Sequence, residues 1–312
     1  MPDNARHHRL LTPPLSREQI LNHPLFLTIE VGIARHLVSI HEETPRLARL
    51  KASHQKWIMT QMLYALQLER DPLATSTGLT ASRLYDVLAR YAVVSRNTVA
   101  SYLAELVAYK FLRDAPDSQD KRKRPLEITD AAARAMYSWF LGHMTCLDRL
   151  DGGNRAERCE SDPALFRLGQ PYAARALIDA PAWRNRPETV ASFIWAESGG
   201  MVLHELISRL ASDKEQDGKI FLGEISIAEI AQKYAISATN VKRMFAPAEA
   251  AGLLGWERPR RRGRLWFSPT FLRDYFHWQS VKFAALDEAV HWAEQQSHDD
   301  ETSGIARNHK AG

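Results

Sequence analysis

Side chains that can hydrogen-bond to bases or phosphates stand together in the stretch "VSRNTVASYLAELVAYKFL", residues 94–112. Ser95 is a typical N-cap residue, because its hydroxyl can accept a hydrogen bond from an amide of the first helical turn. The apolar residues from Val99 to Phe111 recur at helical spacing and predict a helix with one buried face. Its polar front is suited either to contact DNA or to form an ordinary solvated surface. The residues expected at this exposed front are Ser95, Arg96, Asn97, Thr98, Ser101 and Tyr102.

Two basic runs follow stretches of this kind. "QDKRKRP", residues 119–125, contains four consecutive bases, and "ERPRRRGR", residues 257–264, contains five arginines in seven positions. The net charge of the whole chain is only +4, so the distribution of charge matters more than its total. Two runs of the sequence carry dense positive charge. Such runs are commonly solvated loops, and a nuclear-localisation signal is an alternative in a eukaryotic protein.

The chain contains an internal repeat. A shift of 142 residues places "YAVVSRNTVASYLAELVAYKFL" over "KYAISATNVKRMFAPAEAAGLL", with Ser95 on Ser237 and Val99 on Val241. Each copy reads as a short helix, a turn and a second helix, and a basic run follows at the same distance. With a three-residue adjustment, Trp139 lies over Trp278. The alternative to a repeat is chance similarity, because the identity is low.

Each basic run is expected to form the tip of a β-hairpin. The returning strands alternate apolar and polar residues, with Leu126 and Ile128 in the first copy and Leu265 and Phe267 in the second. A helix-turn-helix followed by a cationic hairpin is a winged helix. Its second helix enters the major groove of DNA and its wing lies over phosphates or the minor groove. The fold class expected is mainly α with small β-hairpin wings, as two tandem winged helix-turn-helix units joined by long helices in a pseudo-dimer.

The first copy resembles the DNA-binding lobe of the MarR transcription regulators over roughly residues 55–140. Their wing carries an Asp-x-Arg, here Asp120 and Arg122, followed by alternating apolar residues and a threonine, here Thr129. The resemblance implies that Arg122 reaches the minor groove and that Asp120 supports the wing. Lys110 departs from the pattern, because the family usually has a glycine there. Lys110 must then adopt left-handed geometry or the turn must differ.

The second copy is a looser match to the same family. It keeps the glycine, as Gly252, but it lacks the wing aspartate. Pro247 lies inside the predicted second helix and is expected to bend or shorten it. Beyond the first helix front, the residues expected to contact DNA are Lys121, Arg122, Lys123, Arg124, Thr239, Lys242, Arg243, Arg260, Arg261, Arg262 and Arg264.

The predicted organisation places helices around the two units. The segments are N-terminal packing or dimerisation helices (1–54), the first winged helix (55–150), a linker with connecting helices (151–190), the second winged helix (191–269), a C-terminal helix (270–296) and a disordered tail (297–312). The polar stretch "DGGNRAE", residues 151–157, is the best linker candidate. MarR proteins are homodimers, so this chain resembles two fused halves. A further homodimer and a monomer remain equally open.

Partners other than duplex DNA follow from the same resemblance. MarR proteins often bind aromatic effectors, and Trp57, Tyr64, Trp139 and Trp195 are candidates for lining such a pocket, although aromatics at helical spacing more often form core. No cofactor or metal is expected. "HELIS" at His204 begins like a zinc-protease helix, but Ser208 stands where the second histidine is required, so an enzyme is not expected. The serious alternative to a DNA-binding regulator is a winged-helix module that docks proteins.

The remaining composition places the chain among globular proteins. The hydrophobic fraction is 45% and the charged fraction 25%, and 312 residues suit two domains. No apolar run is long enough for a membrane span, and the start of the chain does not have the apolar core of a signal peptide. Cys146 and Cys159 are too few for a disulfide framework. A cytoplasmic, nucleoid-associated and bacterial regulator is the expectation.

Overall fold

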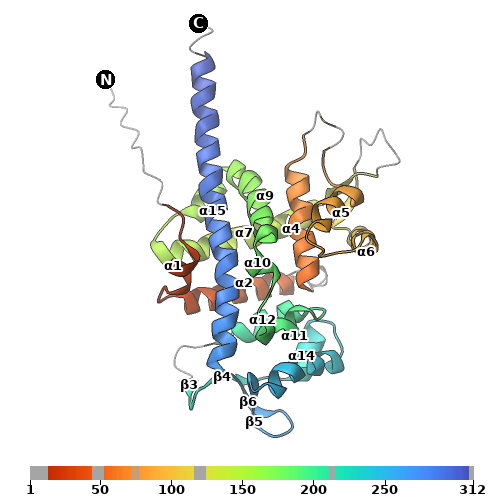
Figure 1. Cartoon of the computed structure of the whole chain (residues 1–312), viewed down its shortest axis with the longest axis vertical. Coiled ribbons are helices and arrows are strands. Elements are labelled where there is room, and N and C mark those ends of the chain that lie inside the picture. Colours follow the sequence, from red (N-terminus) through yellow and green to blue (C-terminus); the bar gives the residue numbers. More distant parts are fainter. Residues whose placement is uncertain are drawn as a thin grey trace.

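The computed structural model describes residues 13–43, 53–71, 74, 77–115, 124–210 and 215–308, with side chains as far as residue 298. The fold is mainly helical, with two small antiparallel sheets (Figure 1). The helices are α1 (Arg17–Leu21), α2 (Phe26–Glu43), α4 (His54–Leu68), α5 (Ala81–Ala89), α6 (Arg96–Ala108), α7 (Asp130–Asp151), α8 (Arg155–Ser161), α9 (Pro163–Asp179), α10 (Pro181–Arg184), α11 (Glu188–Ile194), α12 (Gly199–Ile207), α13 (Ile227–Lys233), α14 (Ala238–Ala250) and α15 (Pro269–Asn308). The strands are β1 (Leu112–Asp114), β2 (Leu126–Ile128), β3 (Glu215–Gln216), β4 (Lys219–Glu224), β5 (Leu254–Arg258) and β6 (Arg262–Phe267).

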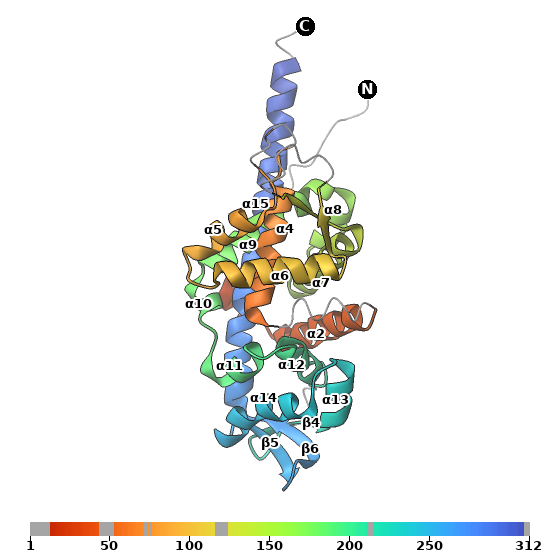
Figure 2. The same cartoon turned by 90° about the vertical axis from the view of Figure 1, so that its right-hand side faces the viewer.

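Two apolar cores are joined by one long helix. The first core lies among α2, α4–α7 and α9, and the second lies among α11–α14 and β4–β6. The first turns of α15 contribute Phe271 and Tyr275 to the second core, and its middle turns contribute Phe283 and Val290 to the first. Figures 1 and 2 show α15 running past both groups, with α13, α14 and the larger sheet around its lower end. None of the described helices is long and apolar enough to cross a membrane.

The internal repeat is present in the order and length of the elements. Shifting α6 by 142 residues gives residues 238–250, which are the bounds of α14. Ser95 and Ser237 both cap their helices, accepting hydrogen bonds from the amides of Thr98 and Asn240 at 3.1 Å. Each helix is preceded by a short helix and a turn, and is followed by an antiparallel strand pair. The N-cap residues and the apolar spacing therefore specify the same local structure in both copies.

The two sheets also correspond. β1 pairs with β2, and Leu79 bridges to Leu126 just before α5. In the second copy, β4 occupies the position before α13 and pairs with β6, giving the strand order β3-β4-β6-β5. Both copies thus pair a segment before the short helix with the returning strand. Leu126 and Leu265 are buried on these returning strands, as the alternating pattern predicts.

Lys110 adopts the left-handed geometry that the missing glycine implies. Its φ is +61°, and the equivalent Gly252 has a φ of +67°. Because a side chain is strained in this region, Lys110→Gly is expected to raise the free energy of unfolding by about 1 kcal/mol. The reciprocal Gly252→Lys has open space around its new side chain, so only the backbone strain should lower its stability. Urea denaturation measures both changes, and a destabilised Lys110→Gly would contradict the explanation.

Pro247 does not shorten its helix, which was one of the two effects that the sequence predicted, the other being a bend. α14 continues through Pro247 to Ala250 and is 13 residues long, the same length as α6. Proline removes the amide that would bond to the carbonyl of Arg243. Both residues are exposed, so water can satisfy that carbonyl and the helix is maintained by its buried face, which includes Met244 and Phe245.

The C-terminal segment is also more helical than predicted. α15 runs to Asn308, so residues 297–308 of the predicted disordered tail continue the helix, and residues 309–312 lie outside the described part of the chain. Extension of an existing helix requires no new nucleus, and each added residue gains one hydrogen bond. The packed part of α15 therefore provides the start for a segment that has little apolar pattern of its own.

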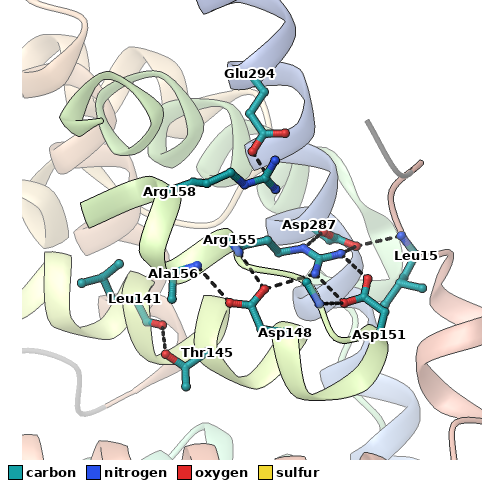
Figure 3. A network of polar contacts seen from close by, with 11 residues as sticks. Leu15, Leu141, Thr145, Asp148, Asp151, Arg155, Ala156, Arg158, Asp287 and Glu294 are labelled. Atoms are coloured by element: carbon teal, nitrogen blue, oxygen red, sulfur yellow. Dashed lines mark hydrogen bonds and ion pairs between the residues drawn. The ribbon is translucent and has the colours of Figure 1, made fainter. Parts of the chain in front are cut away.

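The polar stretch at 151–157 contains the end of α7, a short turn and the start of α8. α7 ends at Asp151, Gly152 takes left-handed geometry, and α8 begins at Arg155. Arg155 is buried among three carboxylates, with Nη2 2.7 Å from Asp151 Oδ2, Nε 2.6 Å from Asp287 Oδ1, and Nη1 3.3 Å from Asp148 Oδ1 (Figure 3). Asp287 also accepts a hydrogen bond from the amide of Leu15 at 2.7 Å. This cluster ties α7, α8, α15 and the segment before α1 together.

Candidate nucleic-acid interface

The front of α6 presents an arginine and two small polar side chains to solvent. Arg96, Asn97 and Ser101 are exposed. The Arg96 guanidinium lies 4.2 Å from the centre of the Tyr85 ring, and its Nη2 lies 4.0 Å from Asp86 Oδ1, so two exposed contacts with α5 position the arginine. Ser95 and Thr98 are engaged in the cap, because their hydroxyl oxygens lie 2.8 Å apart. The helix front can therefore offer guanidinium, amide and hydroxyl groups to one ligand.

Tyr102 is not at this exposed front, and the expectation for it was wrong. Its side chain is 2% exposed, and its hydroxyl lies 2.6 Å from Thr60 Oγ1 on α4. Tyr102 follows Val99 by three residues, so the two share the buried face of the helix. The polar hydroxyl misled the sequence interpretation, and its buried partner on α4 could not be read from the sequence.

The front of α14 has a different set of side chains. Thr239, Lys242 and Arg243 are exposed, as is Asn240. No described carboxylate forms an ion pair with Lys242 or Arg243. The two fronts are therefore chemically unlike. Arginine, asparagine and serine stand on α6, whereas threonine, lysine and arginine stand on α14.

In the second hairpin, some arginines form ion pairs within the protein and others are exposed to solvent. Arg261 donates to Glu249 of α14 at 2.7 Å and to the carbonyl of Lys242 at 3.3 Å, so it fastens the hairpin to the helix. Arg264 pairs with Glu257 across the hairpin at 2.7 Å, and this pair holds the pKa of Glu257 at about 2. Arg260 and Arg262 stay exposed at the tip. Among the predicted contacts in the described hairpin, these two are placed best to reach a ligand.

The tip of the first hairpin lies outside the described residues. This applies to Asp120, Lys121, Arg122 and Lys123, whose predicted roles remain predictions. At the base of the hairpin, Arg124 Nε lies 2.8 Å from Asp114 Oδ1, and their hydrogen bond lowers the pKa of Asp114. The sequence interpretation assigned wing support to Asp120 and did not identify Asp114.

A cavity of about 70 Å³ lies where the two cores meet. Trp57 and Trp139, two of the four aromatic residues considered for an effector pocket, line it together with Trp183 and Trp278. The four indoles form a chain of ring contacts from one core to the other. Tyr64 lines a separate small cavity beside α6. The 61% exposed Trp195 lies outside the cavity.

Two buried ionisable side chains lie beside this cavity. Lys282, which lines it, and Glu30 of α2 are both buried, with Tyr275 next to the carboxyl group. Burial raises the pKa of Glu30 to about 7 and lowers the pKa of Lys282. Cys146 and Cys159 are free and buried, and burial raises the pKa of each thiol to about 12. Both thiols are thus kept in their protonated form.

Comparisons of the chain with protein-family models, with curated proteins and with solved structures find no match.

Proposed function

We propose that this chain is a transcription regulator that binds duplex DNA through two unlike winged helix-turn-helix units of the MarR type. The observation that carries the proposal is the structural repeat. In each copy, a capped helix with an exposed polar front precedes a strand pair whose sequence contains a basic run. The fronts of α6 and α14 would enter successive major grooves, and the hairpins would lie over phosphates or the minor groove.

The unlike helix fronts imply an asymmetric DNA site. Arginine contacts guanine well and asparagine contacts adenine, so Arg96 and Asn97 are the side chains suited to base reading. Lys242, Arg243, Arg260 and Arg262 would supply mainly charge for phosphates in the second copy. The simplest arrangement is two unequal half-sites about one helical turn, roughly 34 Å, apart. The regulator would act in the cytoplasm at the nucleoid, as one chain or as a further homodimer.

The tryptophan-lined cavity is our candidate for the effector that the MarR resemblance implies, and at about 70 Å³ it would have to widen to hold an aromatic molecule. It lies between the two cores, so a bound aromatic molecule would contact elements of both units. Its effect would be observed as a change in DNA affinity when the molecule is added. The alternative function, a protein-docking module, would leave the helix fronts without DNA affinity.

The test is fluorescence-anisotropy binding to random duplex DNA, titrated with salt and followed by sequencing of the retained fraction. We expect binding that weakens steeply with salt and selects a two-part, unequal motif. The double variants Arg96→Ala/Asn97→Ala and Lys242→Ala/Arg243→Ala should each lower the affinity for the selected site by about tenfold or more. The second variant should also reduce the salt dependence.

Arg134→Ala provides the matched control, because it removes an exposed arginine from α7 outside both fronts. Its affinity should stay close to that of the parent. Circular dichroism would show whether each variant is folded. No binding at low salt, or double variants that bind as tightly as the parent, would reject DNA binding and favour the docking module.

A further inference from the structure

An open groove of about 410 Å³ lies on the side of the molecule where α4, the turn between α5 and α6, and the segment from α10 to α11 meet. Its walls include His54, Tyr91, Arg184, Arg186 and Trp195. Neither helix front forms part of it. The volume is within the range of sites that hold small organic ligands.

The groove combines stacked aromatic rings with arginines. The Arg186 guanidinium lies 3.3 Å from the centre of the Trp195 ring, and Arg184 lies 5.2 Å from the centre of the Tyr91 ring. Trp195 is 61% exposed although Arg186 covers one of its faces, so the other face is open to solvent. A large exposed indole next to a fixed cation is a surface on which a flat aromatic ring can stack.

The two arginines in the groove have few protein partners for their positive charge. The Nε atoms of Arg184 and Arg186 are buried without a hydrogen-bond partner, and no described carboxylate forms an ion pair with either side chain. Burial lowers the pKa of Arg186, and the nearby charge of Glu188 offsets this only in part. Among the residues that line the groove, two arginines face one carboxylate, Glu188, while Asp179 accepts a hydrogen bond from Tyr91 outside the lining. An anion is therefore the complementary ligand.

His54 adds a neutral polar group to the groove. Its side chain is 7% exposed, and its Nε2 has no hydrogen-bond partner. Burial and the nearby charge of Arg186 lower its pKa to about 3, so the imidazole stays uncharged at neutral pH. His54 lines the tryptophan-lined cavity as well as the groove, so its buried ring nitrogen is not assigned to the ligand.

We propose that this groove binds a nucleoside phosphate, with the base stacked on the open face of Trp195 and the phosphate held by Arg184 and Arg186. A flat ring and an anion in one small molecule match the two kinds of surface that the groove brings together. Guanidinium groups bind phosphate through paired, charge-assisted hydrogen bonds. Stacking accepts any base, so the site should bind all four nucleotides with similar affinity.

Isothermal titration calorimetry of the full chain with adenosine monophosphate tests the site without DNA, so its outcome is independent of the proposed regulator function. Adenosine and inorganic phosphate are titrated as separate probes. We expect one nucleotide per chain and an affinity at least about tenfold above that of either part, because both contacts contribute. Equal binding of inorganic phosphate and the nucleotide would overturn the stacking, and no nucleotide binding would overturn the site.

Matched variants separate the two contacts. Arg184→Ala/Arg186→Ala and Trp195→Ala should each weaken nucleotide binding by about tenfold or more, whereas Trp195→Phe should retain most of it by keeping an aromatic face. Arg134→Ala again removes one exposed arginine elsewhere and should bind like the parent. Folding of each variant is checked by its melting curve. Unchanged nucleotide affinity in both alanine variants would place the ligand elsewhere and reject the proposal.

Discussion

Replacing Arg155 with alanine is expected to lower the free energy of unfolding by about 3–5 kcal/mol. The side chain of Arg155 is 6% exposed and contacts Asp148, Asp151 and Asp287 (Figure 3). Removal of the guanidinium would leave three carboxylates close together, with Asp287 buried and Asp148 and Asp151 partly exposed, and their repulsion would be uncompensated. Urea denaturation followed by circular dichroism measures the loss. Arg155→Lys should be intermediate, because one ammonium cannot match the planar fork of arginine.

Arg175→Ala is the matched control for this prediction. Arg175 also forms an ion pair between helices, with Nη2 2.5 Å from Glu69 Oε2, but its side chain is 40% exposed. Water and salt screen an exposed pair, so its loss should change stability by less than about 1 kcal/mol. A similar cost for both variants would show that burial of the Arg155 cluster is not the source of its contribution.

The second large effect expected is a pH-dependent loss of stability caused by Glu30. Its pKa rises from 4.5 to about 7 in the folded chain, mainly because burial disfavours the carboxylate. Between these values the folded state holds a proton that the unfolded state has released. Stability from this group is thus fully present below pH 4.5 and is lost as the pH rises toward 7, with a slope of up to about 1.4 kcal/mol per pH unit.

Glu30→Gln isolates this contribution, because the amide is neutral at every pH. The stability of the variant relative to the parent should increase from pH 5 to pH 7.5, measured by urea denaturation at several pH values. Lys282 remains in both chains, but the Glu30 carboxylate raises its pKa, so the difference between the chains measures the Glu30–Lys282 pair. Glu43→Gln alters an exposed glutamate on the same helix and should follow the parent. A constant difference between Glu30→Gln and the parent would contradict a shifted Glu30.

The local structure of the two copies could be predicted from the sequence because it depends on local signals. Ser95 and Ser237 mark the helix starts, and the apolar spacing that follows defines the buried faces. The left-handed conformation of Lys110 was one of two alternatives that the lysine in place of the family's glycine left open. Such features require only a few neighbouring residues, so they can be predicted without tertiary contacts.

The remaining features depend on contacts between distant segments. The hydroxyl of Tyr102 is buried because Thr60 lies opposite it on another helix, and Arg155 is buried because Asp287 approaches from α15. The groove combines Tyr91 with Arg186 and Trp195, which lie about a hundred residues further along the chain. The stretch "PAWRNRP", residues 181–187, contains both arginines of the groove, but its tryptophan, Trp183, is buried in the core and it does not reveal the opposing wall.

The continuity of α15 limits how the two units can move relative to each other. Its first turns are packed in one core and its middle turns in the other, with no interruption of the helix between them. A change in the separation of the α6 and α14 fronts would therefore require one core to repack. If both fronts bind DNA, α15 would hold them at a fixed separation. The spacing between half-sites would then be recognised together with their bases.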